Sequence, residues 1–520
     1  MRRAACLLLA TSLLAGCSSK ASLHTDPYIG TVSLPGGSSV QYNSSALAGD
    51  TLRLLYGDNG STLLRGGEVL ARASSAETII LVEDTETGVS NHYLIRSNDP
   101  DTASGRRTSI YDNSGSLVYS CEGEASATLA GDLLILTPAN SYFEPVDMEY
   151  AADVCRVVEL STGEELAVPA GAVSCISVGD LLFFTVYELP AGLSSMYDDP
   201  YLYAHYAVIV QTRDGQMQKR FDHCIAQAPY GYDLPGWVLL TFFADGSYYD
   251  VTGSTLYNPT TGKELSGYER TLSDNLVCIS EQYGYSSSGY FVYDLSADKT
   301  LARYVAPCME YLDGMAVLRT TDDGDTVFTF IDRDGTASPL SGYDRSGDAL
   351  VLCFTDGRVA CYNTVDGSLL WESVLAQPAG TRDYWCTAVP GGYATVSFYN
   401  KEYVTLAVQI YGPEGLCYDS TSSEVSYNHV GQIAYNDGEP VFSASYNGLA
   451  DAYLYDLIDS SGTVLVHTLS TAYQAGDNFP EDCFMAAQGF VRGWMNADGE
   501  WYYCESVFSS LADEDDLNYF

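Results

Sequence analysis

Short apolar runs separated by turn residues make up most of the chain after residue 30. Runs rich in Val, Ile, Leu, Tyr, Phe and Thr alternate with Gly, Asp, Asn and Ser, which is typical of β-strands joined by tight turns. No sustained apolar stripe at positions i, i+3, i+4 and i+7 follows residue 30, although an amphipathic helix would need one. The pattern therefore predicts an all-β protein.

One hairpin signature recurs along the chain. In "YNTVDGSLLWESVL" (362–375) a strand-like run meets a turn that ends at Gly367, and a second run follows. The same strand–turn–strand pattern occurs in weaker form around Gly115, Gly163, Gly215, Gly262, Gly335, Gly415 and Gly462. Several of these glycines are separated by 47 to 52 residues. A period in the forties with several strands per period is typical of a β-propeller.

A second element lies between these hairpins. Strand–turn–strand runs begin at Cys175, Cys308, Cys386 and Cys483, and "ATLAGDLLIL" (127–136) has the same shape without cysteine. We interpret each as the first two strands of a blade. The prediction is a single β-propeller of four-stranded blades over residues 35–510, with eight blades favoured and seven as the alternative. The run 500–508 is the expected closing strand, which would pair with strands from the other end of the chain.

The stretch "DGSLLWE" (366–372) resembles the repeat of the PQQ-like, quinoprotein-type propellers, a WD40-like architecture. In its enzymes, this resemblance implies a cofactor and a calcium ion on the axis, a catalytic Asp, and often a disulfide between adjacent cysteines. No two cysteines are adjacent here, and the repeat tryptophan is present at full strength only at Trp371. We therefore expect no cofactor, no bound metal and no catalytic residue of that type.

The N-terminus predicts the location of the protein. Arg2 and Arg3 precede an apolar run that is too short to span a membrane, and Leu14-Ala15-Gly16-Cys17 follows. This sequence resembles the lipobox of bacterial lipoproteins; the alternative is an ordinary cleaved secretion signal. The resemblance implies a signal peptide over 1–16 and a Cys17 acylated with chains such as palmitate. A tether would cover 17–34, and 511–520 would form an acidic tail. The expected location is the cell envelope, anchored to the bilayer on the extracytoplasmic side.

Charge and missing motifs exclude several classes of function. The net charge of −44, from 24 basic and 68 acidic residues, repels nucleic acid. Dinucleotide-binding, P-loop, zinc-protease and serine-hydrolase motifs are absent from the sequence. The six histidines, His24, His92, His205, His223, His429 and His467, have no ligand spacing. Asp322, Asp323 and Asp325, like Asp332 and Asp334, are interpreted as hairpin tips rather than calcium ligands.

Of the fourteen cysteines, Cys6 lies in the predicted signal peptide and Cys17 is the predicted acylation site, which leaves twelve. Equivalent positions on successive blades lie beyond the ~7 Å Cα limit for a disulfide, so we expect most of the twelve to be unpaired. A two-residue loop would place Cys353 and Cys361 on opposite faces of their hairpin. A three-residue loop would make them diagonal neighbours. Either way they are expected not to be bonded together.

The favoured function is a non-catalytic binding or scaffold module for a protein or glycan partner. Tyrosine-rich stretches at 196–206 and 281–293 fall between the hairpins, and exposed tyrosines favour such contacts. Enzyme activity stays open. The alternative is a surface hydrolase or sugar-processing enzyme with a pair of carboxylates at the channel mouth, whose residues the sequence does not identify.

Overall fold

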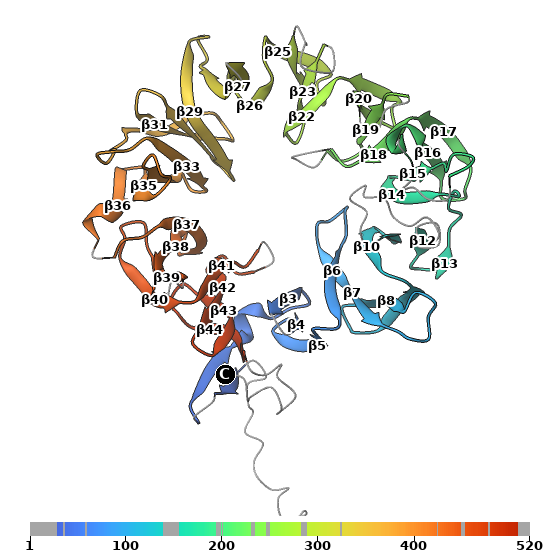
Figure 1. The fold of residues 1–520 in the computed structure, drawn as a ribbon, viewed down its shortest axis with the longest axis horizontal. Coiled ribbons are helices and arrows are strands. Elements are labelled where there is room, and N and C mark those ends of the chain that lie inside the picture. Colours follow the sequence, from blue (N-terminus) through green and yellow to red (C-terminus); the bar gives the residue numbers. More distant parts are fainter. Residues whose placement is uncertain are drawn as a thin grey trace, which may run out of the picture.

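The strands of this chain form antiparallel sheets that follow one another around a ring (Figure 1). The computed structural model describes residues 29–34, 37–57, 60–138, 155–193, 199, 201–229, 234–245, 250–281, 289–322, 325–423, 425–448, 453–476 and 479–507. The predicted signal peptide, Cys17, His24, Asp323 and the acidic tail lie outside these residues. The first strand begins at Ile29, within the range expected for the tether.

The first half of the ring contains a hairpin, a three-stranded sheet and four four-stranded sheets, with strands paired in chain order. They are β1 (Ile29–Ser33) and β2 (Ser39–Asn43); β3 (Leu52–Gly57), β4 (Gly60–Arg65) and β5 (Glu68–Ser74); β6 (Thr78–Glu83), β7 (Ser90–Asn98), β8 (Arg106–Asp112) and β9 (Leu117–Glu122); β10 (Ala125–Ala130), β11 (Leu133–Pro138), β12 (Arg156–Glu159) and β13 (Glu164–Glu165); β14 (Ala172–Val178), β15 (Leu181–Tyr187), β16 (Tyr206–Thr212) and β17 (Met217–Asp222); β18 (Cys224–Gln227), β19 (Val238–Phe243), β20 (Val251–Asn258) and β21 (Lys263–Ser266).

The second half contains four four-stranded sheets and a seven-stranded one. They are β22 (Tyr268–Ser273), β23 (Leu276–Ser280), β24 (Tyr290–Asp294) and β25 (Lys299–Tyr304); β26 (Cys308–Leu312), β27 (Met315–Asp322), β28 (Asp325–Ile331), β29 (Ala337–Ser346), β30 (Ala349–Phe354), β31 (Arg358–Asn363) and β32 (Leu369–Val374); β33 (Asp383–Val389), β34 (Tyr393–Tyr399), β35 (Thr405–Gly412) and β36 (Gly415–Asp419); β37 (His429–Asn436), β38 (Glu439–Asn447), β39 (Tyr453–Ile458) and β40 (Val464–Leu469); β41 (Thr471–Gln474), β42 (Cys483–Gln488), β43 (Val491–Asn496) and β44 (Trp501–Ser506).

The predicted all-β class is confirmed. Helix in the described residues is limited to short 3₁₀ turns: η1 (Ser44–Leu47), η3 (Leu202–His205) and η4 (Ser420–Ser422). Within each four-stranded sheet the first strand in sequence lies towards the centre of the ring and the last lies on its outside (Figure 1). This is the arrangement of propeller blades.

All eight predicted glycine hairpins join the last two strands of a repeat unit, as at β8–β9 and β31–β32. Their turn glycines have positive φ, for example 83° at Gly115 and 68° at Gly367, where glycine carries no steric penalty. The expected count of eight blades is not confirmed. Three further hairpins of this kind occur, at Gly67, Asp298 and Gly499, and the seven-stranded sheet combines two repeat units that share β29.

Burial follows the position of a strand within its sheet. Second strands such as β30 (ALVLCF) and β15 (LLFFTVY) are buried on both faces, because neighbouring sheets cover them on each side. Outer strands such as β17 (MQKRFD) alternate between exposed and half-buried positions. The apolar clusters span neighbouring sheets: one cluster joins Val351 of β30 with Val396 of β34. Each sheet therefore depends on its neighbours for its core.

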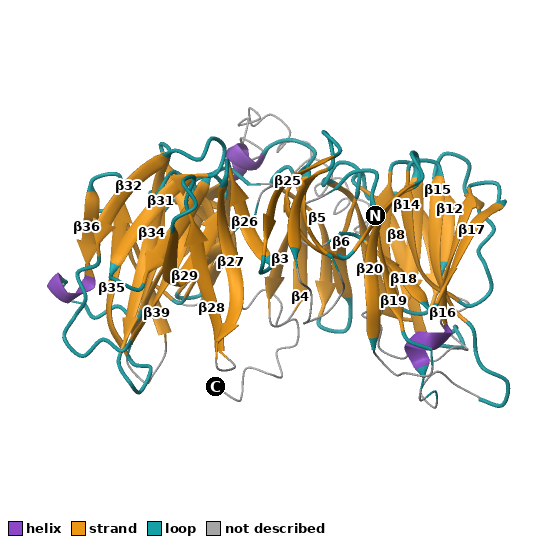
Figure 2. Cartoon of the chain, turned by 90° about the horizontal axis from the view of Figure 1, so that it is seen from above, coloured by secondary structure: helices purple, strands orange, loops and turns teal. Residues whose placement is uncertain are grey.

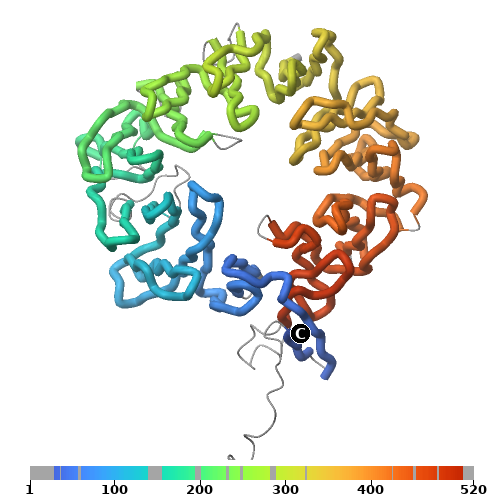
Figure 3. The backbone as a smooth tube through the Cα atoms, turned by 180° about the vertical axis from the view of Figure 1, so that it is seen from behind, coloured from blue at the N-terminus to red at the C-terminus, as the bar shows by residue number. Residues whose placement is uncertain are grey.

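The two ends of the chain meet at one junction in the ring, where blue and red segments adjoin (Figure 3). Leu55 and Leu64 of the first sheet pack with Trp494 and Tyr503 of the last. The expected closing strand forms as β44, but it pairs with β43 of its own sheet. The predicted strand exchange is thus wrong for the described strands. The β1–β2 hairpin packs against the last sheet instead, with Val32 and Val40 among the contacting side chains.

The twelve cysteines of the described residues are unpaired, as expected for most of them, and all but Cys417 are buried. Cys353 lies opposite Val359, and Cys361 lies opposite Val351. This register corresponds to the three-residue loop, so the two-residue alternative is wrong. Cys175, Cys308 and Cys386 are on first strands, but Cys483 is on β42, a second strand, so the predicted equivalence fails for Cys483.

The ring has two faces that the strand directions define. Because successive strands are antiparallel, every first and third strand begins at the same face, and every second and fourth strand ends there. We call this the aromatic face, for reasons given below. The opposite face holds the tight third-to-fourth-strand turns, and we call it the hairpin face. In the side view of Figure 2 the helical turn beside β16 lies at the lower edge, which is the aromatic face.

Candidate binding face

Exposed aromatic side chains gather on one face of the ring. Seven of the large exposed hydrophobic side chains in the described residues are aromatic: Tyr56, Tyr201, Trp385, Tyr403, Tyr453, Tyr473 and Phe490. Six of them lie near the start of a first or third strand, near the end of a second strand, or in the connection between a second and a third strand. Tyr473 lies instead near the middle of its strand pair, because it is the third residue of the four-residue strand β41 and pairs with Met485, the third residue of β42. The other six are therefore on the aromatic face, while the exposed hydrophobic residues of the hairpin face, such as Val365 and Leu416, are aliphatic.

Six of the seven lie on four consecutive sheets. Trp385 and Tyr403 belong to the sheet β33–β36, Tyr453 to β37–β40, Tyr473 and Phe490 to β41–β44, and Tyr56 to β3–β5. Apolar clusters between these sheets show that they are neighbours across the chain junction. We call these six side chains the aromatic arc. Trp385 and Tyr403 are 68% and 71% exposed, so the arc is open to a partner.

Tryptophan illustrates how position decides exposure. Trp371 of β32 is buried, donates from Nε1 to the carbonyl oxygen of Gly392 at 2.5 Å, and stacks on Tyr411 at 6.2 Å between ring centroids. These contacts join its sheet to the next, so the repeat tryptophan is structural. Trp385, fourteen residues later, stands near the start of an inner strand and is exposed.

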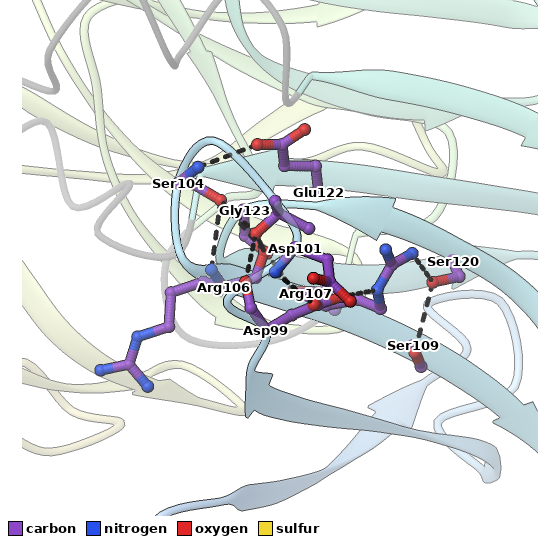
Figure 4. Close-up of polar contacts among 11 residues, drawn as sticks. Asp99, Asp101, Ser104, Arg106, Arg107, Ser109, Ser120, Glu122 and Gly123 are labelled. Carbon is purple, nitrogen blue, oxygen red and sulfur yellow. Dashed lines mark hydrogen bonds and ion pairs between the residues drawn. The ribbon is translucent and has the colours of Figure 1, made fainter.

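Elsewhere the aromatic face carries charged loops instead. In the β7–β8 loop (Figure 4), Arg107 Nε lies 2.5 Å from Asp99 Oδ2, and the backbone N–H of Ser104 donates to Glu122 Oε1 at 2.8 Å. Arg107 also donates to Ser120 Oγ at 3.3 Å. The hydrogen bond and charge of Arg107 lower the pKa of Asp99, which keeps this half-buried carboxylate ionised. The loop is held by polar contacts and carries no large exposed hydrophobic side chain among the described residues.

A buried Asp–His pair lies on the same face. Asp199 accepts from the Tyr187 hydroxyl at 2.6 Å and lies 2.7 Å from Nδ1 of His205, with its side chain 1% exposed. Burial opposes ionisation, but these bonds and the backbone N–H of Tyr201 outweigh it and lower the pKa of Asp199. Sequence reasoning treated His205 as an isolated loop residue. The short separation of six residues between His205 and Asp199 was the feature of the sequence that could have indicated this pair.

The inner strands carry a buried ion pair. Arg345 of β29 donates to Glu310 Oε2 of β26 at 2.9 Å and to the carbonyl oxygen of Leu272 of β22 at 3.2 Å. It thereby joins three consecutive repeat units. Burial raises the pKa of Glu310 despite Arg345, and burial also raises the pKa of Asp344 on β29.

The remaining predicted residues are dispersed. Asp332 Oδ1 accepts from the backbone N–H groups of Asp334 and Thr336, so this acidic stretch is a hairpin tip as predicted. His467 lies 3.6 Å from the buried Asp456, and His223 contacts the carbonyl oxygen of Ala204. Within the described ranges, no group of three or more His, Cys, Asp or Glu side chains is arranged to hold a metal ion. Nor does any described helix have the length and apolar character needed to cross a membrane.

Comparisons with known proteins match parts of this architecture. A sequence family described as a domain of unknown function (DUF5046) matches residues 256–514. No curated protein matches the sequence. Among solved structures, BamB from Moraxella catarrhalis is 10% identical over 84% of this chain and 94% of its own, with a TM-score of 0.25.

Two further solved structures are similar at the same level. A eukaryotic initiation factor is 11% identical over 71% of this chain and 95% of its own, with a TM-score of 0.30. Hsv2 from Kluyvelomyces marxianus is 8% identical over 62% of this chain and 89% of its own, with a TM-score of 0.24. Because these identities and TM-scores are low, no function is transferred from them to this chain.

Proposed function

We propose that this protein is a non-catalytic, lipid-anchored binding module of the cell envelope, whose partner docks on the aromatic face. The observation that carries the proposal is the location of six of the seven exposed aromatic side chains of the described residues on one face, five of them on four consecutive sheets. Contiguous exposed apolar side chains mark interaction sites on soluble proteins. Tyrosine and tryptophan are also the residues that contribute most to binding energy at interfaces.

The contrast between the two faces supports a specific surface. Both faces are built from the same repeated hairpins, so repetition alone would distribute aromatic residues equally between them. The hairpin face has turns fixed by glycine and aliphatic side chains such as Val365 and Leu369. The aromatic face has the longer connections between second and third strands, and loops are where binding residues concentrate.

The lipid anchor rests on the N-terminal sequence. The run Leu14-Ala15-Gly16-Cys17 resembles a lipobox, and two or three acyl chains on Cys17 would hold the protein stably on a bilayer. We expect the wild-type protein to incorporate labelled palmitate and to sediment with membranes. Cys17→Ser should abolish the labelling and release the protein. Labelling that persists in Cys17→Ser would contradict the assignment of the acylated residue.

The binding surface is tested by paired substitutions. Trp385→Ala with Tyr403→Ala removes two exposed rings of the aromatic arc, whereas Val365→Ala with Leu416→Ala removes exposed aliphatic side chains from the hairpin face. After crosslinking in intact cells, the first double variant should lose the partner that co-purifies with wild type, and the second should retain it. Loss of the partner in both double variants, or in neither of them, would contradict docking on the aromatic face.

A hydrolase remains the second candidate because three carboxylates with raised pKa values lie on inner strands: Glu269, Glu310 and Asp344. Of these, Glu310 and Asp344 interact electrostatically. A carboxyl group with a raised pKa can act as a general acid. Glu310 forms an ion pair with Arg345, however, and this ion pair would have to break before a substrate could approach Glu310. Hydrolysis of a glycoside by wild type and its loss in Glu310→Gln and Asp344→Asn, with both variants folded, would favour the enzyme.

A further inference from the structure

One section of the aromatic arc differs chemically from the rest of this acidic protein. Around the sheet β37–β40 the polar side chains near the aromatic face include two amides and an imidazole: the half-buried Asn428 and the exposed His429 and Asn447 accompany the exposed rings of Tyr453 and Tyr473. We call these five residues the neutral patch. The sequence contains no lysine or arginine between residues 402 and 491, so the patch has no basic residue in its own sheet.

The carboxylates in the described part of this sheet lie away from the patch, while Glu424 and Asp451 lie outside the described residues. Of those in 425–448 and 453–476, Asp437 and Glu439 flank the β37–β38 turn on the hairpin face, and Asp459 lies in the β39–β40 turn on that face. Asp456 is 2% exposed and accepts from the Tyr427 hydroxyl at 3.0 Å. The described aromatic-face surface of this sheet is therefore uncharged, although the chain as a whole carries −44.

Four of the five residues are linked to one another through contacts and strand pairing. Asn428 Nδ2 donates to Asn447 Oδ1 at 3.1 Å, and Asn447 lies directly opposite Tyr453 in the β38–β39 pairing. Two residues along β39, the hydroxyl of Tyr455 is hydrogen-bonded to that of Tyr473 on the next sheet. The exposed rings of Tyr453 and Tyr473 thus stand on either side of Tyr455 and bridge two neighbouring sheets.

His429 adds another neutral group. Its ring lies over Gly431, where a Cβ atom would come within 3.2 Å of Nε2. Partial desolvation of its ring lowers the pKa of His429, which favours the uncharged imidazole at neutral pH. An uncharged imidazole has one donor and one acceptor nitrogen, and each asparagine amide likewise offers both kinds of group.

Resting on the proposed binding function, we infer that the neutral patch binds an uncharged oligosaccharide. Sugar rings present apolar C–H faces that stack on aromatic rings, and their hydroxyl groups each donate and accept hydrogen bonds. Exposed tyrosine rings provide surfaces on which the C–H faces can stack, and the neighbouring amide and imidazole groups can hydrogen-bond to the hydroxyl groups. Two rings on neighbouring sheets give a footprint longer than one sugar unit, so the ligand is a chain rather than a monosaccharide.

Charge decides between this ligand and a protein partner at the patch. A basic protein attracted to a chain with a net charge of −44 would dock where carboxylates are exposed. Its binding would become weaker as the salt concentration rises. An acidic or sulfated glycan would need basic groups, which this sheet does not contain. The uncharged surface therefore favours a neutral glycan, and salt dependence separates the alternatives.

The test is binding of the full chain to neutral oligosaccharides of glucose, galactose, mannose and N-acetylglucosamine, beside sialylated, uronic-acid and sulfated glycans. We expect at least one neutral series to bind, with little change in affinity between low and high salt. Tyr453→Ala and Tyr473→Ala should each weaken this binding by about tenfold. Tyr473→Phe, which keeps the ring, should stay within about threefold of wild type. Tyr201→Ala, on the same face but outside the arc, is the matched control and should bind as wild type.

Failure of the inference is distinguishable from failure of the proposed function. Absence of neutral-glycan binding, preference for charged glycans, or unchanged affinity in both tyrosine variants would overturn the inference. In any of those cases, loss of a crosslinked protein partner in the Trp385→Ala, Tyr403→Ala variant would leave the binding function intact and identify the arc as a protein-docking surface.

Discussion

The carboxylate of Glu505 binds the guanidinium of Arg72 from the opposite end of the chain, with Oε2 3.1 Å from Nη1. The same oxygen accepts from Thr62 at 2.9 Å, and Oε1 accepts from Nη2 of Arg492 at 2.7 Å. The Glu505 side chain is 4% exposed. A single buried acid of the last strand therefore joins the last sheet to β4 and β5 of the first, alongside the apolar contacts of the junction.

Glu505→Ala should destabilise the protein by about 3 kcal/mol, because it leaves Arg492 largely buried without its counter-charge and removes the acceptor of Thr62. Arg72→Ala should cost less than about 1 kcal/mol, since half of the Arg72 side chain is exposed and water can replace the lost bond. Guanidinium denaturation measures both free energies. Equal losses in the two variants would contradict the role assigned to Glu505.

Trp371→Phe should reduce the free energy of unfolding by about 2 kcal/mol. The variant loses the bond to Gly392 and part of the stacking on Tyr411, both between neighbouring sheets. Trp385→Phe is the matched control, because Trp385 is exposed and should change stability little. Denaturation followed by circular dichroism compares the two. A loss at Trp385 as large as that at Trp371 would refute the structural assignment of the repeat tryptophan.

The twelve cysteines should react as free but protected thiols. Burial raises the pKa of the Cys155 and Cys361 thiols to about 12, so little thiolate forms at pH 8. Cys417, the half-buried one, should react first with a thiol reagent in the native protein, and all twelve should react after denaturation. The measurement is a thiol titration with and without denaturant, followed by peptide mapping. Two or fewer reactive thiols after denaturation would show that disulfides form.

Glu310 should make stability fall as pH rises above about 4.5. Burial raises its pKa in the folded protein above the ordinary glutamate value of 4.5, so the folded state holds this proton more tightly than the unfolded state does. Stability from this group is fully present below pH 4.5 and is lost as pH rises through the folded pKa. Denaturation midpoints of wild type minus those of Glu310→Gln should therefore decrease with pH over this window. A difference that increases with pH would mean that Arg345 outweighs burial.

Much of the repeat architecture could be predicted from the sequence, because turn glycines record backbone geometry. The hairpins around Gly115 and Gly367 were identified since a turn with positive φ selects glycine. The equivalent turn at Asp298 was missed because an aspartate, and not a glycine, stands at the position with positive φ, here 52°. Aspartate tolerates positive φ better than most residues do. The unrecognised unit is one reason why the expected count of eight blades is not confirmed.

The candidate site was harder to predict, since tyrosine suits both buried and exposed positions of a sheet. Tyr411 and Tyr473 are both strand residues that follow an apolar residue, yet the first is fully buried and the second is exposed. The difference depends on which face of the sheet a neighbour covers, and one sequence does not contain that information. The junction contact between Arg72 and Glu505 could likewise not be predicted from local sequence patterns, because 433 residues separate the two.

The central claim, that the partner docks on the aromatic face, is tested most directly by placing a photo-crosslinking residue at Trp385 and, separately, at Leu369 on the hairpin face. Both positions are at least half exposed, so the probe is accessible in each. After irradiation of intact cells, the account predicts a discrete crosslinked product from position 385 and none from position 369. A product from position 369 alone, or the same product from both positions, would contradict it.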